Sequence, residues 1–302
     1  MMRACPLCLK SSEARRTGVF GEYAMYLCAE CGVEYSDPFK GPGPAWYEDS
    51  GTYGAGRVIT KRPEWYHREA LAALAPGGSL LDVGCGTGIF LNEARRRGFD
   101  AWGIDFDKNN IAVARSRYGL DRVYCMSAAD LMLKSGGIRF DAVTFFEVLE
   151  HLDAPAGFLD GLKGLLRPGG LIAMSVPNRD RFIDTLGQGD SPPNHLTRWS
   201  AEGLRAFLER SGFEVVRLHE KRADHVEVRN YLLARVRLGL AHGLVKKGLE
   251  GGDHRSIAKA GYLMAVKDAL FGAMAHPPGA FLRLLGLKGG GIVALARLKG
   301  AR

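Results

Sequence analysis

Short apolar runs alternate with amphipathic segments through the middle of the chain, and this pattern predicts alternating strands and helices. We expect strands at residues 79–83, 101–105, 122–126, 140–146, 171–176 and 213–218. We expect helices at residues 62–75, 89–97, 108–118, 160–166 and 201–211. Ser200 is the expected N-cap of the last helix. Strands that alternate with helices usually pair in parallel, so the pattern predicts an α/β domain.

Composition places the chain among ordinary globular proteins, with 46% hydrophobic and 25% charged residues. No apolar run approaches the roughly 20 residues of a membrane span, and the N-terminus has no signal-peptide pattern, so we expect a cytoplasmic location. The formal charge of +8 is concentrated at residues 226–302, which hold 13 Lys and Arg against 4 Asp and Glu. A near-neutral body argues against nucleic-acid binding inferred from net charge alone.

Three alternate glycines, Gly84, Gly86 and Gly88, stand between the apolar run 79–83 and the helix expected at 89–97. Glycine at a strand-to-helix turn permits positive φ and lets backbone N–H groups approach a ligand. Asp105 ends the next expected strand, 21 residues after Gly84. An acid at that position suits hydrogen bonding to ribose hydroxyls, so the stretch predicts a nucleotide-type ligand site.

The motifs Leu-Asp-Val-Gly-Cys-Gly-Thr-Gly at 81–88, Gly-Ile-Asp at 103–105 and the run 140–152 resemble class I S-adenosylmethionine (SAM) dependent methyltransferases. The branch that includes the ubiquinone-biosynthesis O-methyltransferases and many small-molecule and sugar methyltransferases is the most similar. The resemblance implies a Rossmann-like seven-stranded sheet with helices on both faces and 291–298 as the final, antiparallel strand. Residues 62–302 would then form the methyltransferase domain, with a basic helical insertion at 221–290 before the last strand.

The resemblance also implies the residues that contact the cofactor. They are Asp82, Gly84, Cys85, Gly86, Gly88, Asp105, Phe106, Ser127, Ala128, Asp130 and Phe146. The glycine turn would bind the methionine end, Asp105 the ribose, residues 127–130 the adenine, and Phe146 would lie near the sulfonium. Ser127 stands where the family often has an acid, and either the serine itself or Asp130 would bind the adenine amino group.

Two Cys-x-x-Cys pairs, Cys5 with Cys8 and Cys28 with Cys31, predict a small zinc ribbon over residues 1–35. The strand-like residues 23–27 would form part of its hairpin. Disulfide bonds and a redox Cys-x-x-Cys are the alternatives; a cytosolic chain disfavours the first, and the second lacks its βαβ context. Four thiolates close the coordination sphere, so this zinc would be structural. The two remaining cysteines, Cys85 and Cys125, are expected to be packed thiols.

Glu147, Glu150 and His151 follow the strand expected at 140–146, at the end of a parallel sheet where ligands bind. In a helix these three residues share one face and could bind Mg²⁺ or another divalent metal. The same residues resemble the magnesium ligands of ubiquinone-type O-methyltransferases. The alternative is that they serve only in packing and helix capping.

His195 lies in a polar loop at 192–200 that resembles a segment of the same branch bringing a histidine over the substrate. His195 would act as a general base, or as a further ligand of a metal at Glu147, Glu150 and His151. The alternative is a solvent-facing loop histidine without a catalytic role.

Residues 36–61 form a Gly-, Pro- and aromatic-rich linker, in which Tyr47 or Tyr53 could close over the cofactor as lid residues. The other interpretation is that they dock the ribbon on the main domain. Residues 229–247 predict a basic amphipathic helix. It would make a peripheral contact with an anionic membrane, cover a lipophilic substrate, or pack on the core.

Together these features predict a SAM-dependent methyltransferase that methylates an oxygen of a small molecule, glycan or lipid precursor, with His195, Glu147 and His151 on the acceptor side. A second hypothesis is an RNA methyltransferase that uses the ribbon to recognise its substrate. A third is a non-catalytic partner protein that binds SAM. The near balance of charge in residues 1–35 argues against the second, and the acceptor-side residues argue against the third.

Overall fold

The structure is a computed structural model that describes residues 2–42, 62–134, 136–184, 186–235 and 254–300. The chain forms two compact units. Unit 1 comprises residues 1–179, 188–220 and 291–302, and unit 2 comprises residues 180–187 and 221–290. Each unit is described by itself below.

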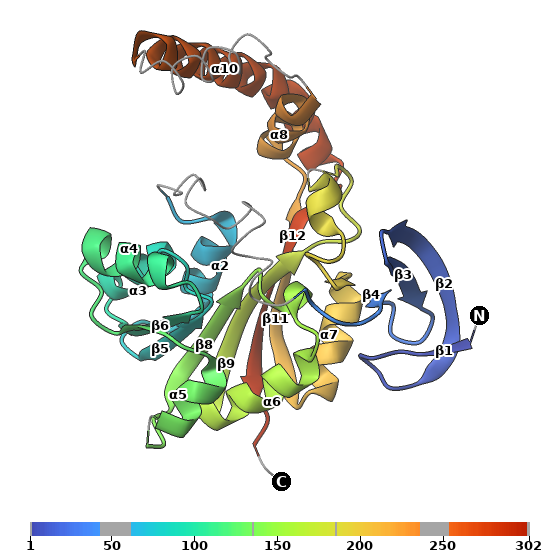
Figure 1. The fold of residues 1–302 in the computed structure, drawn as a ribbon, viewed down its shortest axis with the longest axis vertical. Helices are drawn as coiled ribbons and strands as arrows, with labels where there is room; N and C mark the ends of the chain where they lie inside the picture. Colours follow the sequence, from blue (N-terminus) through green and yellow to red (C-terminus); the bar gives the residue numbers. More distant parts are fainter. Residues whose placement is uncertain (1, 43–61, 135, 185, 236–253, 301–302) are drawn as a thin grey trace. The chain divides into compact units, whose positions relative to one another are not determined.

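A seven-stranded sheet forms the centre of unit 1 (Figure 1). Its strands are β5 (Ser79–Val83), β6 (Asp100–Asp105), β7 (Val123–Cys125), β8 (Phe140–Phe146), β9 (Leu166–Pro177), β11 (Phe213–Arg222) and β12 (Lys288–Leu298). They run in the order β11-β12-β9-β8-β5-β6-β7. Strands β7, β6, β5, β8 and β9 pair in parallel, whereas β12 is antiparallel to β9. This order confirms the Rossmann-like fold with a final antiparallel strand.

Helices cover both faces of the sheet. They are α2 (Trp65–Ala73), α3 (Ile89–Arg96), α4 (Lys108–Tyr118), α5 (Ala128–Lys134), α6 (Pro155–Leu165) and α7 (Ala201–Arg210). One buried cluster contains residues of α2, α3 and α4, and the other contains residues of α6 and α7. Ser200 Oγ accepts the N–H of Gly203 and caps α7, as predicted. Helix α6 begins at Pro155, earlier than the predicted residue 160, because proline fits the first helical turn.

The N-terminal strands form a second sheet that the sequence predicted only in part. β1 (Met2–Ala4), β2 (Ser11–Phe20), β3 (Tyr23–Cys28) and β4 (Glu34–Asp37) are antiparallel neighbours in this order. A fifth strand, β10 (Thr197–Arg198), pairs antiparallel with β4. The predicted ribbon boundary at residue 35 therefore falls inside β4. The ribbon shares its sheet with the segment that follows His195.

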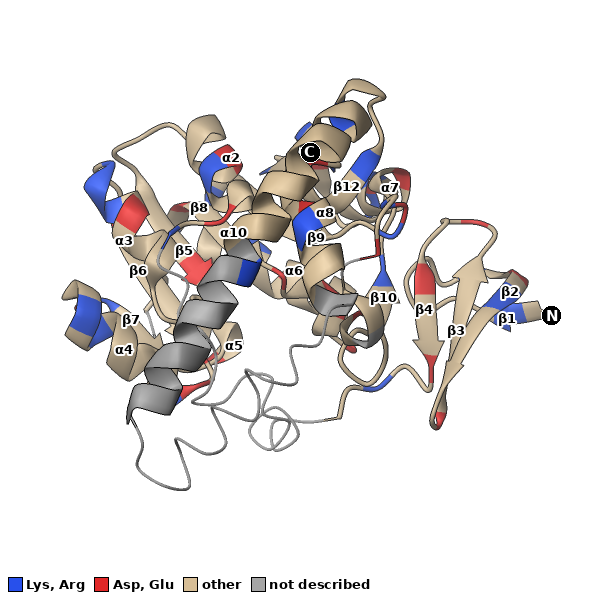
Figure 2. Ribbon diagram, turned by 90° about the horizontal axis from the view of Figure 1, so that it is seen from above, with Lys and Arg blue, Asp and Glu red and all other residues tan. Residues whose placement is uncertain are grey.

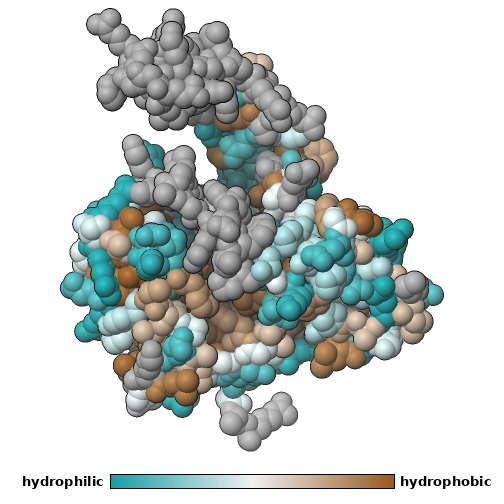
Figure 3. Space-filling view, viewed as in Figure 1, coloured by the Kyte–Doolittle hydropathy of each residue, from teal (hydrophilic) through white to brown (hydrophobic). Residues whose placement is uncertain are grey.

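Unit 2 contains α8 (His225–Arg235) and α10 (His254–Leu284). Of the helix predicted at 229–247, residues 229–235 belong to α8 and residues 236–253 lie outside the described residues. The chain that leads into β12 is tied to α8 where Glu227 Oε1 accepts the N–H of Gly290 at 2.7 Å. Apolar side chains gather on the surface at the end of α10, where Phe281, Leu284 and Leu285 are exposed (Figure 3). Among the helices that the structure describes, none is both long and apolar enough to cross a membrane.

Candidate functional site

The glycine turn joins β5 to α3 in a backbone conformation that residues other than glycine rarely adopt. Gly84, Gly86 and Gly88 have φ of +76°, +52° and +81°. A Cβ at Gly88 would lie 2.7 Å from Leu120, and one at Gly84 would lie 2.9 Å from Val148. At Gly86 a Cβ would meet nothing within 4 Å, so this position borders open space. The turn therefore presents bare backbone toward a ligand at the N-terminus of α3.

Asp105, at the end of β6, anchors this turn. Its Oδ2 accepts the N–H of Gly86 and its Oδ1 accepts the N–H of Asp107, both at 2.8 Å. Asn110 also hydrogen-bonds to this carboxylate, whose two oxygens have about four acceptor sites in all, so it can still accept a ligand hydroxyl. Asp82 is different, because it is buried and accepts Thr144 Oγ1 at 2.6 Å. Burial raises the pKa of Asp82 to about 8.

Some of the other residues predicted to contact the cofactor lie at the surface, and others are buried in the core. Phe106 is 80% exposed beside Asp105. Ser127 donates its backbone N–H and its hydroxyl to Asp130 Oδ2, at 3.1 and 2.7 Å, so the serine and the acid stabilise one turn that begins α5 at Ala128. Two residues are buried instead. Cys85 lies under Gly103, and Phe146 packs edge-on against Phe90 and His67.

Glu147 leaves the sheet in an unusual conformation. It has φ of +54°, and the short 3₁₀ helix η1 (Leu149–His151) begins only after it. Its Oε1 accepts Ser175 Oγ at 2.7 Å. The prediction that Glu147, Glu150 and His151 share one helical face was wrong, because the left-handed residue ends regular geometry before Glu150. Burial raises the pKa of Glu147 to about 7, with a smaller contribution from the negative charge of Asp190.

Glu150 is the most unusual polar residue of unit 1. Its side chain is 1% exposed, and neither carboxyl oxygen has a hydrogen-bond partner within the described part of the chain. Burial, reinforced by the charge of Glu147, raises the pKa of Glu150 well above its ordinary value. A buried carboxyl without partners is strongly unfavourable unless it is protonated or faces a cation or ligand donor.

Two imidazoles lie beside this carboxyl. The Nδ1 of His151 donates to the backbone oxygen of Asn194 at 2.7 Å, because a carbonyl oxygen can only accept. Its Nε2 lies 4.0 Å from Glu150 Oε1. The Nδ1 of His195 lies 2.9 Å from Asp190 Oδ1, as in an Asp–His pair. The two rings meet edge to face, with centroids 4.6 Å apart.

One donor atom from each of Glu150, His151 and His195 lies within 4.8 Å of the others, so the three side chains could bind one cation. The Nδ1 atoms of the two rings lie against Asn194 O and Asp190 Oδ1, which is the usual support of metal-binding or basic histidines. Glu147 lies outside this set. His195 is buried, so the solvent-facing alternative for this histidine was wrong. We call Glu150, His151 and His195 the acceptor-side cluster.

The four N-terminal cysteines form a second cluster. Cys5 Sγ lies 3.7 Å from Cys31 Sγ, and Cys8 Sγ lies 3.8 Å from Cys28 Sγ. Zn–S bonds of about 2.3 Å separate the thiolates of a tetrahedral site by about 3.8 Å, so these distances fit zinc. Burial acts to raise the pKa of Cys28, but hydrogen bonds from Ser12 and the backbone N–H of Cys31 outweigh it and lower the pKa to about 7.

The two halves of the cysteine cluster have matching backbones. Leu9 N–H donates to Cys5 O at 2.9 Å, and Gly32 N–H donates to Cys28 O at 3.0 Å. Both donors have positive φ, of 61° and 66°. The Cys-x-x-Cys spacing is thus built into two equivalent knuckles, with an unusual left-handed leucine in the first.

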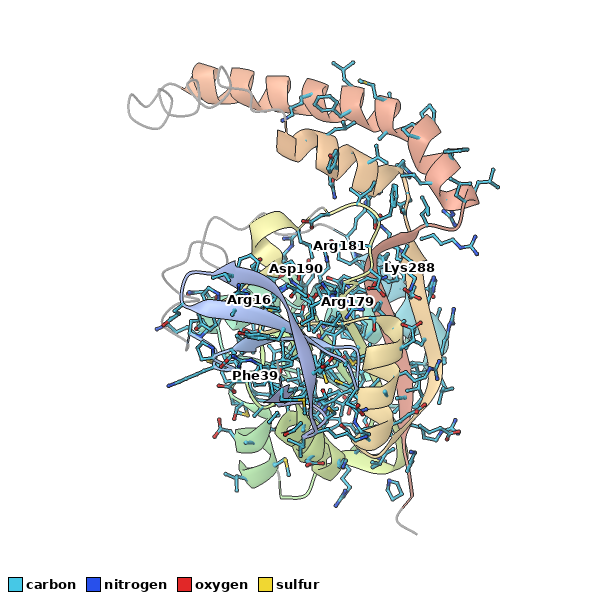
Figure 4. All side chains as sticks on the ribbon, turned by 90° about the vertical axis from the view of Figure 1, so that its right-hand side faces the viewer. Arg16, Phe39, Arg179, Arg181, Asp190 and Lys288 are labelled. Atoms are coloured by element: carbon cyan, nitrogen blue, oxygen red, sulfur yellow. The ribbon has the colours of Figure 1, made fainter. Side chains whose placement is uncertain are left out.

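Several residues of these sites were not anticipated. Asp190 and Asn194 orient the two histidines, and their only signal in the sequence is their nearness to His195. Figure 4 labels Asp190 and Arg179 among the side chains of unit 1, where Arg179 donates to Gly32 O of the second knuckle. Tyr47 and Tyr53, the predicted lid residues, lie outside the described residues.

Comparisons with known proteins agree with this fold and these motifs. Residues 59–218 match a family model described as a methyltransferase domain. The chain is 32% identical over 188 residues to a ubiquinone biosynthesis O-methyltransferase of Caulobacter vibrioides, covering 54% of this chain and 74% of the relative. It is 34% identical over 162 residues to a probable S-adenosylmethionine-dependent methyltransferase of Mycolicibacterium smegmatis, covering 50% and 60%.

Among solved structures, the 1,6-didemethyltoxoflavin-N1-methyltransferase of Burkholderia thailandensis aligns with a TM-score of 0.51 at 17% identity. The alignment covers 95% of this chain and 100% of that one. At this identity the likeness concerns the fold alone.

Proposed function

Because the chain belongs to the methyltransferase-domain family and is a SAM-dependent methyltransferase, we propose that it transfers the methyl group to a hydroxyl oxygen of a small molecule, glycan or lipid precursor. The observation that carries the proposal is the buried carboxyl of Glu150 beside two imidazoles, with no hydrogen-bond partner for either oxygen among the described residues. Glu150 and His151 follow β8, and His195 lies in the segment after β9, beyond the same carboxyl edge of the sheet that also presents the glycine turn.

In this proposal the chain does two things. The glycine turn and Asp105 orient SAM, so that its methyl group lies in line with the acceptor oxygen. The Nε2 of His195 takes the acceptor proton, and Asp190 stabilises the imidazolium that forms by accepting Nδ1–H. His151 and Glu150 orient the acceptor hydroxyl beside His195.

The two other hypotheses have less support. An RNA methyltransferase needs a basic, aromatic surface next to the cofactor, but the residues gathered beyond β8 are carboxylates and histidines. A non-catalytic SAM-binding protein would not need two oriented imidazoles beside a buried acid. In addition, the relatives of this chain include proteins named as O-methyltransferases.

The acceptor class can be tested by incubating the full chain with methyl-labelled SAM and a fractionated cell extract. We expect label in the small-molecule, glycan or lipid fraction, released by reagents that cleave ethers or esters and not by nuclease. Label that enters RNA would overturn the proposal in favour of the second hypothesis.

Replacing Asp105 by alanine is expected to weaken SAM binding roughly 10- to 100-fold, because hydrogen bonds to a charged group contribute about 1.5–3 kcal/mol. The change removes the acceptors for the ribose and the anchor of Gly86. Calorimetric titration with S-adenosylhomocysteine measures the affinity. Asp100→Ala is the matched control, since Asp100 is an exposed acid at the other end of the same strand. Equal affinities for the two variants would contradict the assignment.

A divalent cation bound by Glu150, His151 and His195 is a second candidate for the acceptor side, favoured by the missing partners of Glu150. One carboxylate and two imidazoles suit first-row transition metals better than Mg²⁺. Such a cation would supply positive charge beside the acceptor oxygen.

Replacing Glu150 by glutamine separates the two candidates, because the amide keeps the size of the side chain but removes its charge. If the cluster binds a cation, metal analysis of the wild-type chain loaded with Mn²⁺ should give one ion besides the zinc of the ribbon, and E150Q should lose only that ion. A wild-type chain that holds no second ion would overturn the cation candidate and leave His195 as the base. Ser175→Ala, which affects only the partner of Glu147, is the control.

A further inference from the structure

The ribbon and the acceptor-side cluster are connected through the backbone around His195. Ser36 N–H of β4, the last strand of the ribbon, donates to Leu196 O at 2.9 Å. Leu196 N–H donates in turn to Glu150 O at 2.8 Å. The two residues that follow, Thr197 and Arg198 of β10, pair with Tyr35 and Glu34 of β4. The segment that carries His195 therefore lies between the ribbon and Glu150, hydrogen-bonded to both.

Arg198 adds a side-chain connection along the same path. Its Nη1 lies 3.6 Å from Glu34 Oε2 of β4, and its Nε donates to the backbone oxygen of Asp190 at 2.6 Å and lies 3.5 Å from Asp190 Oδ2. Its Nη2 donates to Ser191 Oγ at 3.0 Å. Figure 2 shows the acidic positions on β4 and a basic position by β10. The other oxygen of Asp190 is the one that pairs with His195.

All the charges on this path are shielded from water. The side chains of Glu34, Asp190 and Arg198 are 10%, 3% and 20% exposed. Glu34 Oε2 has no hydrogen-bond partner in the described residues, so the guanidinium is its nearest counter-charge. A planar guanidinium fixes several oxygens in one geometry, which an ammonium group cannot do. Loss of Arg198 would leave two buried acids without this shared cation.

The path begins at the zinc knuckle. Cys28 N–H donates to Val33 O at 3.1 Å, which places Glu34 directly after the turn that contains Cys31. A Cβ at Gly203 of α7 would lie 2.9 Å from Val33 and 3.2 Å from Cys31 O, so the knuckle packs closely on the methyltransferase helix. The position of Glu34 therefore depends on the closed knuckle.

We propose that Arg198 is a positioning residue that couples the zinc ribbon to His195, through Glu34 on the ribbon and Asp190 beside the histidine. The expected effect on the reaction rate rests on the proposed function. The coupling between the ribbon and His195 does not depend on which acceptor is methylated. The zinc ribbon then acts as part of the acceptor side of the enzyme, beyond stabilising residues 2–37.

The test compares Arg198→Met, Arg198→Lys and Glu34→Gln in the full chain. The first readout needs no acceptor: nitrogen-15 NMR of labelled histidine reports the protonation of each His195 ring nitrogen. We expect R198M to shift the His195 signals away from the state with the proton on Nδ1. E34Q should cause a smaller shift in the same direction. If R198M does not fold, E34Q alone decides the test.

The second readout is label transfer from SAM into the extract fraction that the wild-type chain methylates. R198M should lower kcat about 10- to 100-fold while KM for SAM stays within about twofold, and R198K should recover part of the loss. Arg205→Met, which removes an exposed arginine of α7, is the matched control. Unchanged His195 signals in R198M and E34Q would overturn the inference. A wild-type chain that transfers no label defeats the proposed function alone, because the NMR result still decides the coupling.

Discussion

Alanine at position 195 is expected to lower the rate of methyl transfer by about 10²- to 10⁴-fold, the usual contribution of a positioned acid or base. His195 is buried, its Nδ1 lies 2.9 Å from Asp190 Oδ1, and its ring belongs to the acceptor-side cluster with Glu150 and His151. The loss should appear in kcat with little change in KM for SAM. Initial rates of label transfer at saturating SAM measure it.

His219→Ala is the matched control, because His219 also pairs with a carboxylate, Glu69, but is 39% exposed and lies on β11. We expect this variant to keep its rate within about twofold. His195→Gln tests whether a hydrogen bond to the acceptor hydroxyl is enough for methyl transfer. Glutamine can make such a bond but cannot take up a proton at neutral pH. Full turnover by H195Q or H195A would show that the chain positions an acceptor that needs no base.

If the four cysteines bind zinc, as the distances between their Sγ atoms favour, removal of that ion is expected to disrupt residues 2–37 and to lower the transfer rate about 10- to 100-fold. Structural zinc contributes about 10–16 kcal/mol to the folding of isolated zinc fingers, so its loss would remove a large stabilising contribution. Because β4 pairs with β10, loosening the ribbon also loosens the chain beside His195. Cys31→Ser should lose the single tightly bound zinc, which elemental analysis measures.

Cys125→Ser is the control for this second prediction, since Cys125 lies outside the cysteine cluster and is exposed on β7. It should retain zinc and rate. The prediction that Cys125 is a packed thiol was therefore wrong, because it stands at the exposed end of that strand. Thermal unfolding and limited proteolysis of C31S should show early cleavage within residues 2–37. A C31S variant that keeps one zinc per chain, or loses zinc with no change in rate, would contradict the expected role.

The cofactor half of the site could be predicted from sequence because its parts are local. Gly84, Gly86 and Gly88 stand at one turn, and Asp105 ends the adjacent strand, so spacing along the chain translates directly into distance in space. The seven-stranded sheet and its antiparallel last strand were expected from the family resemblance, because strand order depends on contacts between distant parts of the chain. Spacing also predicted the four cysteines, since each knuckle is a short turn.

The acceptor half could be predicted only in part, for two physical reasons. The helix assumed for Glu147, Glu150 and His151 depends on regular φ and ψ, and the left-handed Glu147 breaks this regularity. In addition, Glu34 and Arg198 meet through the pairing of two short strands from distant parts of the chain. A strand of two residues has no periodicity to recognise, so this link is invisible until the sheet is seen.

The pairing of β4 with β10 also limits how this protein can be divided. A truncated chain that lacks residues 2–37 would leave the two residues of β10 without β4, the neighbour to which they pair in the five-stranded sheet. The tightly packed Gly203 would face water in place of Val33. We therefore expect the segment that carries His195 to lose order in such a truncated chain, because it is hydrogen-bonded to β4.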